Sequence, residues 1–403
     1  MLTIPKEAKE IITRLESRGF EAYLVGGCVR DLLMGLKAKD FDICTSALPE
    51  DVCGLFAKTL ETGIKHGTVT VIENGIPFEV STFRIDVNYT DHRHPDKVLF
   101  SRSLAEDLKR RDFTINAICY HPEKGIIDPF NGMKDIAAKL IRTVGNPEER
   151  FNEDALRMLR AVRFKASLGF ELEPATKSAI TRMSSTICHI SRERILHELN
   201  GILSGSSPEA FEILFDTGLI GYIFPVPVPV KNTLKPLKKL PHKLPLRWAA
   251  ALRLMGFTDP ADVEEICGYL KMSKKLKNYI LNATKILNEP LPENKYLLKK
   301  TLSDAGIALF SDSLKILNGT GYDIDKIKAL KLMLNDIRSK NEYIDRSDLA
   351  VKGGDLIGKG FIPGKRLGEI IELLFLCVLQ IPGLNRKDIL IEIAKSVQKA
   401  FPE

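Results

Sequence analysis

The spacing of apolar residues changes character part-way along the chain. Up to about residue 145, short runs that alternate apolar and polar side chains are separated by turn residues, which is typical of strands. After Asn152 the alternation gives way to apolar residues three and four apart, which indicates helices. The sequence therefore predicts a small mixed α+β head followed by an elongated, almost entirely α-helical region.

Several local elements of the head can be predicted from the same patterns. An apolar stripe over 5–17 that stops at Gly19 predicts a helix, and 21–25 and 40–44 are predicted strands. Residues 68–72 and 76–83 alternate on either side of Asn74-Gly75, a strong hairpin signal. The polar segment 84–102 is predicted to be a long loop.

Composition narrows the class of protein. A net charge of +7 and a pI near 8.9 favour a polyanionic partner. The seven cysteines are scattered and form no CxxC pair, which argues against a zinc site or a disulfide framework. The most apolar stretch, 370–384, is interrupted by Glu372 and Pro382 and is too short to span a bilayer. A cytoplasmic protein is expected, with no membrane partner.

Asp40 and Asp42 are the first candidate site residues. Side chains two apart on a strand share one face, so these carboxylates should project together while Phe41 and Ile43 face the core. A divalent cation relieves the repulsion between such carboxylates, and Mg²⁺ prefers oxygen ligands. We predict that both aspartates are catalytic and bind Mg²⁺, the alternative being a solvated strand edge. Glu79 is either a third metal ligand or structural.

The glycines before this pair favour the catalytic interpretation. Gly26-Gly27 lies where a strand passes into a helix, and glycine allows backbone N–H groups to approach phosphate closely. Gly27 and Arg30 are therefore candidate triphosphate ligands, because an arginine can fork onto phosphate oxygens. A phosphate cradle followed by paired carboxylates predicts nucleotidyl transfer.

These stretches, GGCVRDLLMG and KDFDICTSALPEDV, resemble the opening of the tRNA nucleotidyltransferase and poly(A) polymerase family, in the subgroup that contains bacterial CCA-adding enzymes. The resemblance continues in order at 107–117, 128–135, 153–157 and 191–198. It implies a polymerase-β-like nucleotidyltransferase head and an all-α remainder. The implied parts are a catalytic head at 1–145, a base-recognising neck at 146–205, a body at 206–290 and a tRNA-binding tail at 291–403.

The segment NEDALRMLRAVRF suggests how a base could be chosen without a nucleic-acid template. If Asp154 and Arg157 lie three apart on a helix, their side chains are neighbours. An ionised aspartate only accepts hydrogen bonds and arginine only donates. Cytosine and adenine each present an amino donor beside a ring-nitrogen acceptor, so the pair complements C and A and leaves U and G with unpaired groups. The family resemblance implies the same two roles.

Three further arginines are candidate nucleotide ligands. Arg160 and Arg163 continue the stripe begun by Arg157, and the resemblance implies that they lie beside the bound nucleotide; a solvated helix face is the alternative. Arg111 fits a ribose or phosphate contact, and the resemblance implies that its segment favours ribonucleotides. Glu198 is expected to brace the base-reading helix.

A basic region in the helical part suggests contact with RNA. No acidic residue occurs between Asp216 and Asp259, and a second basic cluster follows at 271–277. Such residues would bind RNA phosphates, the alternative being a solvated linker. The basic residues of the first cluster are Lys231, Lys235, Lys238, Lys239, Lys243 and Arg247.

The function predicted from these features is addition of C, C and A, from CTP and ATP, to the 3′ end of the tRNA acceptor arm, with release of pyrophosphate. A-only, CC-only and poly(A) activities are the alternatives within the family. Family members restricted to CC have the segment matching 84–102 shortened, and its full length here favours complete CCA addition. A non-catalytic RNA-binding relative is disfavoured because Asp40, Asp42 and Arg30 are all present. The oligomeric state, monomer or homodimer, stays open.

Overall fold

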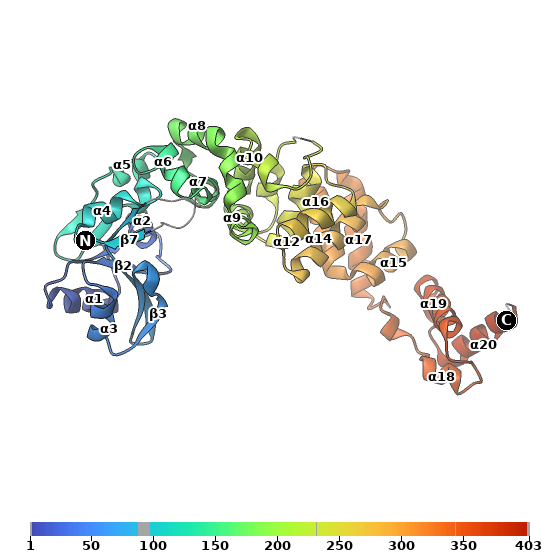
Figure 1. The fold of residues 1–403 in the computed structure, drawn as a ribbon. Coiled ribbons are helices and arrows are strands. Elements are labelled where there is room, and N and C mark those ends of the chain that lie inside the picture. The colour runs from blue at the N-terminus through green and yellow to red at the C-terminus, as the bar shows by residue number, and fades with distance from the viewer. Residues whose placement is uncertain (1, 88–96, 231, 343, 401–403) are drawn as a thin grey trace. The chain divides into compact units, whose positions relative to one another are not determined.

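The computed structural model describes residues 2–87, 97–230, 232–342 and 344–400. The chain divides into two compact units, Met1–Lys238 with Glu265–Met272 and Lys239–Glu264 with Ser273–Glu403. The strands all lie in the first unit, and the described residues after Leu172 contain helices and no strand (Figure 1). The predicted change from a mixed head to a helical remainder is confirmed.

A seven-stranded sheet forms the centre of the head, in the order β3-β4-β5-β2-β1-β8-β9. Strands β2 and β5 are parallel, and every other neighbouring pair is antiparallel. The predicted hairpin is confirmed, since Asn74 and Gly75 between β4 and β5 have φ of 51° and 81°, as a tight two-residue turn requires. The strands are β1 (Ala22–Val25), β2 (Asp42–Thr45), β3 (Thr59–Gly63), β4 (Thr68–Glu73), β5 (Ile76–Thr82), β8 (Cys119–His121) and β9 (Gly125–Ile127).

Two shorter ladders accompany this sheet. The antiparallel pair β6 (Arg84–Val87) and β7 (Lys97–Phe100) corrects the prediction that 84–102 is a loop, because both ends of that segment are strands. Apolar residues at each end, such as Ile85 opposite Leu99, allow the pairing. Residues 88–96 lie outside the described part of the chain. Strands β10 (Leu140–Ile141) and β11 (Glu171–Leu172) form a parallel pair that the sequence did not predict.

Helices surround the sheet and continue beyond it within the first unit. The predicted helix at 5–17 is confirmed as α1, which buries Ala8, Ile11, Ile12 and Leu15. The helices of this unit are α1 (Lys6–Glu16), α2 (Gly27–Leu33), α3 (Pro49–Leu55), α4 (Leu104–Lys109), α5 (Gly132–Ala137), α6 (Pro147–Glu153), α7 (Leu156–Leu168), α8 (Pro174–Met183), α9 (Arg192–Ser204), α10 (Ile213–Asp216) and α11 (Ile220–Ile223).

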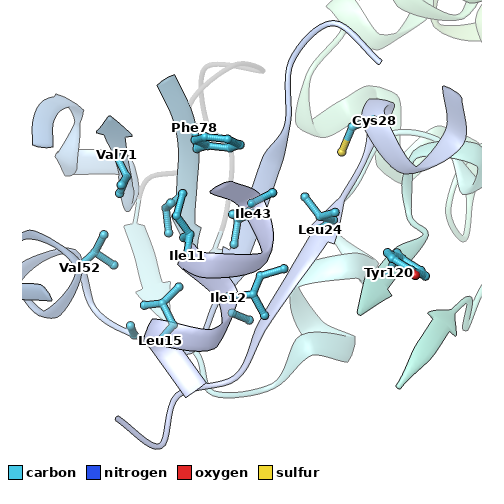
Figure 2. Packing of buried hydrophobic residues seen from close by; sticks show 14 of the residues in the cluster. Ile11, Ile12, Leu15, Leu24, Cys28, Ile43, Val52, Val71, Phe78 and Tyr120 are labelled. Atoms are coloured by element: carbon cyan, nitrogen blue, oxygen red, sulfur yellow. The ribbon is translucent and has the colours of Figure 1, made fainter. Parts of the chain in front are cut away.

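Both faces of the central strands are covered. On one face Ile11, Ile12 and Leu15 of α1 pack with Leu24 of β1 and Ile43 of β2 (Figure 2). On the other face the buried cluster consists of Tyr23, Val25, Cys44, Phe83, Leu108 and Cys119. Because side chains alternate along a strand, Asp42 shares this second face with Cys44. The fold thus directs the Asp42 carboxylate toward the side of the sheet where α4 lies.

The second unit is helical. Its helices are α12 (Leu244–Leu254), α14 (Lys274–Asn288), α15 (Lys295–Ala305), α16 (Ile307–Gly319), α17 (Ile324–Ser339), α18 (Gly353–Ile357), α19 (Lys365–Gln380) and α20 (Lys387–Ala400), while α13 (Pro260–Tyr269) is divided between the units. In the described residues no helix combines the length and apolar character needed to cross a membrane. The finer division into head, neck, body and tail stays a prediction.

Candidate active site

Two carboxylates lie side by side on neighbouring parallel strands. Asp42 of β2 is paired in register with Glu79 of β5, so both side chains leave the same face of the sheet. Ile43 is buried in the opposite face, as predicted. The prediction that Asp40 belongs to the strand is wrong, since β2 begins at Asp42. The partner strand β1 ends opposite Asp42, where the chain turns away at Gly26, and Asp40 lies before the strand in an exposed bend.

The electrostatics of Asp42 reflect this crowding of negative charge. Burial and then the charges of Glu79 and Asp40 raise the pKa of Asp42 to about 6, although the charge of Arg111 opposes them. A carboxylate that ionises reluctantly beside two others suits a cation-binding position, and the donor oxygens are those that Mg²⁺ prefers. Across the residues that the structure describes, no cluster of three or more His, Cys, Asp or Glu side chains could hold a metal ion unaided.

Gly26 brings the backbone close to this carboxylate. Its φ of 81° and ψ of −138° are readily adopted only by glycine, and α2 begins at the next residue, Gly27. A Cβ added at Gly26 would lie 3.3 Å from Nη1 of Arg111 and 3.8 Å from Oδ2 of Asp42. The predicted strand-to-helix turn is therefore present, and it lies against both Asp42 and Arg111.

Arg30 of α2 is buried and already has hydrogen-bond partners. Its Nε and Nη2 donate to Oδ1 of Asp31 at 2.9 and 2.7 Å, and its Nη1 donates to Oδ1 of Asn116 at 2.6 Å. Side-chain exposure is only 10%. A phosphate contact by Arg30 would therefore require it to exchange one of these partners.

Arg111 follows α4 and is held by a buried carboxylate. Its Nη2 donates to Oδ2 of Asp107 at 3.3 Å, and Oδ1 of Asp107 accepts two bonds from Arg110. Asp107 is fully buried. The Nε of Arg111 is a buried donor without a hydrogen-bond partner among the described residues. An unpaired buried donor is costly, so this atom is suited to meeting an incoming acceptor.

Asp112 links the head to α7. Its Oδ2 accepts hydrogen bonds from Nε and Nη2 of Arg160 at 2.9 and 2.7 Å, and its Oδ1 accepts one from Asn116 at 3.1 Å. Burial opposes its ionisation, but the charge of Arg160 and these hydrogen bonds lower the pKa of Asp112 to about 2. The consecutive residues Arg111 and Asp112 therefore connect the surroundings of Asp42 with α7.

The base-reading pair is arranged differently from the prediction. Asp154 is not on the helix with Arg157: it lies in extended conformation between α6 and α7, and its Oδ1 accepts from the backbone N–H of Leu156 at 3.0 Å. Its Oδ2 accepts from Arg194 of α9 at 2.8 Å. The sequence favoured a continuous helix because Asp154 interrupts no apolar stripe. In the structure the helix breaks at Asp154, whose short polar side chain accepts from the first backbone N–H of α7.

Arg157 itself lies in the first turn of α7. It donates to the carboxylate of Glu153 at 2.5 Å and to the backbone oxygens of Arg150 and Arg110, both at 3.0 Å. Farther along α7, Arg163 donates to Glu198 of α9 at 2.6 Å. The prediction that Glu198 braces this helix is confirmed, since its carboxylate is buried and holds Arg163.

Comparison with known protein families covers most of the chain. Residues 22–142 match the poly A polymerase head domain, residues 169–228 the probable RNA and SrmB-binding site of polymerase A, and residues 242–394 the putative tRNA nucleotidyltransferase domain 2. The CCA-adding enzyme of Lacticaseibacillus paracasei is 40% identical over 371 residues, which cover 91% of this chain and 90% of that protein. The CCA-adding enzyme of Limosilactobacillus fermentum is 35% identical over 420 residues and 99% of each chain.

The chain belongs to the CCA-adding enzyme family. The crystal structure of the Bacillus stearothermophilus CCA-adding enzyme in complex with CTP agrees, with 34% identity, a TM-score of 0.83 and coverage of 99% of this chain and 100% of that one. CCA-adding enzymes are tRNA nucleotidyltransferases, and the chain adds CCA to the 3′ end of tRNA. The prediction of complete CCA addition is confirmed. Polymerases with this type of head typically use divalent metal ions.

Several residues that shape the site of this CCA-adding enzyme were given no role from sequence. Arg194 binds Asp154, Glu153 binds Arg157, and Asn116 bridges Arg30 and Asp112. A signal for Arg194 was available, because it lies four residues before Glu198 and therefore on the same face of α9. Of the two partners of Asn116, Asp112 lies four residues before it, whereas Arg30 lies 86 residues away and no local pattern indicates that contact.

The basic residues proposed to contact RNA fall into different classes. Arg247 does not fit that role, because it is buried and donates to the backbone oxygen of Leu240. Lys231 lies outside the described residues. Lys238 and Lys243 are exposed but pair with Glu209 and Asp312 respectively. The remaining exposed lysines of the first cluster are Lys235 and Lys239.

Proposed function

We propose that Asp40, Asp42 and Mg²⁺ carry out nucleotidyl transfer in this CCA-adding enzyme. Asp42 has the position for it, beside Glu79 and Gly26, and the exposed Asp40 is close enough to influence its charge. Bound Mg²⁺ would lower the negative charge at the reacting phosphate and favour the ionised form of the primer hydroxyl. The 3′-hydroxyl of tRNA attacks the α-phosphorus of the nucleotide, and pyrophosphate leaves.

We assign the triphosphate and ribose to the residues around the glycine turn. The backbone of Gly27 begins α2, and Arg30 can exchange a bond to Asp31 for one to a phosphate oxygen. The unpaired Nε of Arg111 supports a role in binding a ribose or phosphate oxygen. Each of these groups lies on or next to the α2 turn or the end of α4.

We assign base selection to Asp154 and Arg157. Asp154 accepts from Arg194 and Leu156, which leaves lone pairs available for the amino group of C or A. Arg157 has five donors, and the three hydrogen bonds described above leave two of them without a partner among the described residues. Arg160 and Arg163 complete this side of the nucleotide site. The expected substrates are CTP and ATP, and the related enzyme of B. stearothermophilus binds CTP.

One observation carries the proposal: the path from Asp42 to Arg111, through its neighbour Asp112, to Arg160 is continuous. The catalytic carboxylates and the base-reading helix can therefore serve one nucleotide.

The exposed lysines are proposed to contact the tRNA acceptor arm, and the four-part division at 145, 205 and 290 is retained as a proposal. These substrates imply action in the bacterial cytoplasm.

Product length on defined primers tests the assignment. The full chain is incubated with tRNA ending in the discriminator base, in C or in CC, with CTP, ATP, UTP or GTP singly and together. Asp40→Ala and Asp42→Ala should abolish extension while tRNA retention in a gel-shift assay persists. The Asp154→Ala variant should extend primers with UTP more readily than the unaltered chain does. Unchanged selectivity would refute the role of Asp154 in base selection.

A further inference from the structure

Three arginines surround one buried phenylalanine in the first unit. The guanidinium carbons of Arg30, Arg160 and Arg163 lie 5.3, 5.5 and 4.6 Å from the centroid of the Phe164 ring. Phe164 is only 6% exposed and contacts Phe113 edge to face, with centroids 5.6 Å apart. Arg30 comes from α2 and the other arginines from α7, so the ring of Phe164 joins two separate elements.

A hydrogen-bond path joins the same two elements. The side-chain oxygen of Asn116 accepts from Arg30 at 2.6 Å, and its nitrogen donates to Asp112 at 3.1 Å. Asp112 in turn accepts both bonds from Arg160. Asn116 is itself buried, in the short 3-10 turn Thr114–Asn116. Arg30 and Arg160 are thus connected twice, once through Asn116 and Asp112 and once across Phe164.

We propose that Asn116 and Phe164 are positioning residues, which hold Arg30 and Arg160 in a fixed relation so that the phosphate end and the base end of the nucleotide are bound by one unit. The inference rests on the proposed nucleotide-binding roles of these two arginines. Neither Asn116 nor Phe164 needs to touch the nucleotide.

The chemistry of both residues suits this task. Neighbouring guanidinium groups repel each other, and each has a carboxylate partner: Asp31 for Arg30, Asp112 for Arg160 and Glu198 for Arg163. The ring of Phe164 attracts the cations without adding a negative charge that would repel a triphosphate. An asparagine is required at 116 because one end accepts and the other donates, whereas aspartate would place two acceptors together.

A mutant cycle measures whether the two arginines act as one unit. Arg30→Lys and Arg160→Lys are made singly and together in the full chain, and kcat and KM for CTP are measured on tRNA ending in the discriminator base. Each single change should raise KM about tenfold, the effect of losing one charge-assisted hydrogen bond. If the arginines form one unit, the double change should raise KM by roughly 20-fold rather than the 100-fold product of independent effects.

The cycle is repeated in a chain carrying Asn116→Ala and Phe164→Leu, where the effects of the two lysine changes should multiply. Phe164→Tyr, which keeps the ring, should retain the wild-type KM for CTP. Phe164→Leu alone should raise it about tenfold, at the size expected for lost cation–π contacts. The matched control is Phe170→Leu, another buried phenylalanine in the same unit with no cation over its ring among the described residues.

The possible failures are distinguishable. If Arg30→Lys and Arg160→Lys each raise KM but their effects multiply in the unaltered chain, the coupling inference is overturned while the proposed function stands. If neither change alters KM, the proposed nucleotide contacts are wrong, and the inference falls with them. If Phe170→Leu raises KM as much as Phe164→Leu, general loss of packing accounts for the effect and the role of Phe164 is refuted.

Discussion

The Oδ2 atom of Asp154 accepts a 2.8 Å hydrogen bond from Nη2 of Arg194, a residue of α9. Arg157, the expected neighbour, donates instead to Glu153. The two groups proposed to read the base are therefore each oriented by a separate partner of opposite charge. On the proposed assignment, base selection would depend on residues that need not contact the base.

Removal of Arg194 should loosen base selection. Arg194→Ala frees a partly buried carboxylate to rotate, because among the described residues the bond from the backbone N–H of Leu156 is then the one that still holds Asp154. The ratio of kcat/KM for CTP to that for UTP should fall about tenfold, equivalent to roughly 1.4 kcal/mol for a charge-assisted hydrogen bond. Competition assays with labelled CTP and UTP measure this ratio.

Arg192→Ala is the matched control, because it removes a guanidinium from the same helix while leaving Asp154 and Arg194 intact. The guanidinium of Arg192 lies over the ring of Tyr269. It should change the ratio less than about twofold, within the usual effect of a surface substitution. Equal loss of selectivity in both variants would contradict the orienting role of Arg194.

Asp42 should make the first unit less stable as the pH rises. Its folded pKa of about 6 exceeds the ordinary value of 3.8, so the folded state binds the proton more tightly than the unfolded state does. Stability is therefore lost between about pH 4 and pH 6, by at most about 3 kcal/mol at higher pH. Asp42→Asn should remove this loss, so that without divalent metal the variant is more stable than the unaltered chain at pH 7.5 and similar to it below pH 4.

Hydrogen exchange of peptides from β1 and β2 measures this effect in the unit concerned, across pH 4 to 8 and in the presence of a chelator. Glu123→Gln, which neutralises an exposed carboxylate between β8 and β9, should leave the profile unchanged. Added Mg²⁺ should stabilise the unaltered chain more than it stabilises the Asp42→Asn variant. A stability that is independent of pH in this window would contradict the crowding of charge at Asp42.

Glu79 should behave as a third catalytic carboxylate. It stands beside Asp42 in the parallel register and raises the pKa of that residue, so Glu79→Gln should lower kcat about 100-fold by removing one oxygen ligand. The Mg²⁺ concentration for half-maximal activity should rise as well. Glu73→Gln, at the end of the adjacent β4, should affect neither quantity, and a similar result for Glu79→Gln would assign Glu79 a structural role.

The sequence predicted those parts of the site that depend on local periodicity. Alternation placed Ile43 and Asp42 on opposite faces of β2, and the Asn74-Gly75 turn fixed the hairpin whose second strand carries Glu79. The parallel pairing of β2 with β5, which sets Glu79 beside Asp42, joins distant segments and was not predicted. The glycine turn at Gly26 was likewise visible, because a strand followed at once by a helix needs a residue that tolerates positive φ.

The remainder depends on contacts between distant segments. Asp40 lies outside the strand, which begins at Asp42, and Asp154 lies in extended backbone between α6 and α7, where it pairs with Arg194 of α9. Arg30 is occupied by Asn116, which lies 86 residues later. No spacing rule along one segment reports the length of its neighbour or the partner of a buried arginine.

Alanine substitutions at two glycines distinguish backbone strain from disturbance of the site. Gly26 and Gly35 both have positive φ, 81° and 71°, so alanine at either position should strain the backbone by about 1–2 kcal/mol. A Cβ at Gly35 would meet no heavy atom within 4 Å in the described chain, whereas one at Gly26 would press on Arg111 at 3.3 Å. Both variants should therefore lose thermal stability.

Only Gly26→Ala should lose activity, by about 100-fold in kcat/KM for CTP, because a small displacement of Arg111 or Asp42 misaligns the reacting groups. Gly35→Ala should keep kcat/KM within about twofold of the unaltered chain, as expected for a change remote from the site. Melting curves and single-nucleotide addition on the same preparations measure the two effects separately. Equal losses of activity at both positions would show that strain in α2, and not the contact with Arg111, limits the reaction.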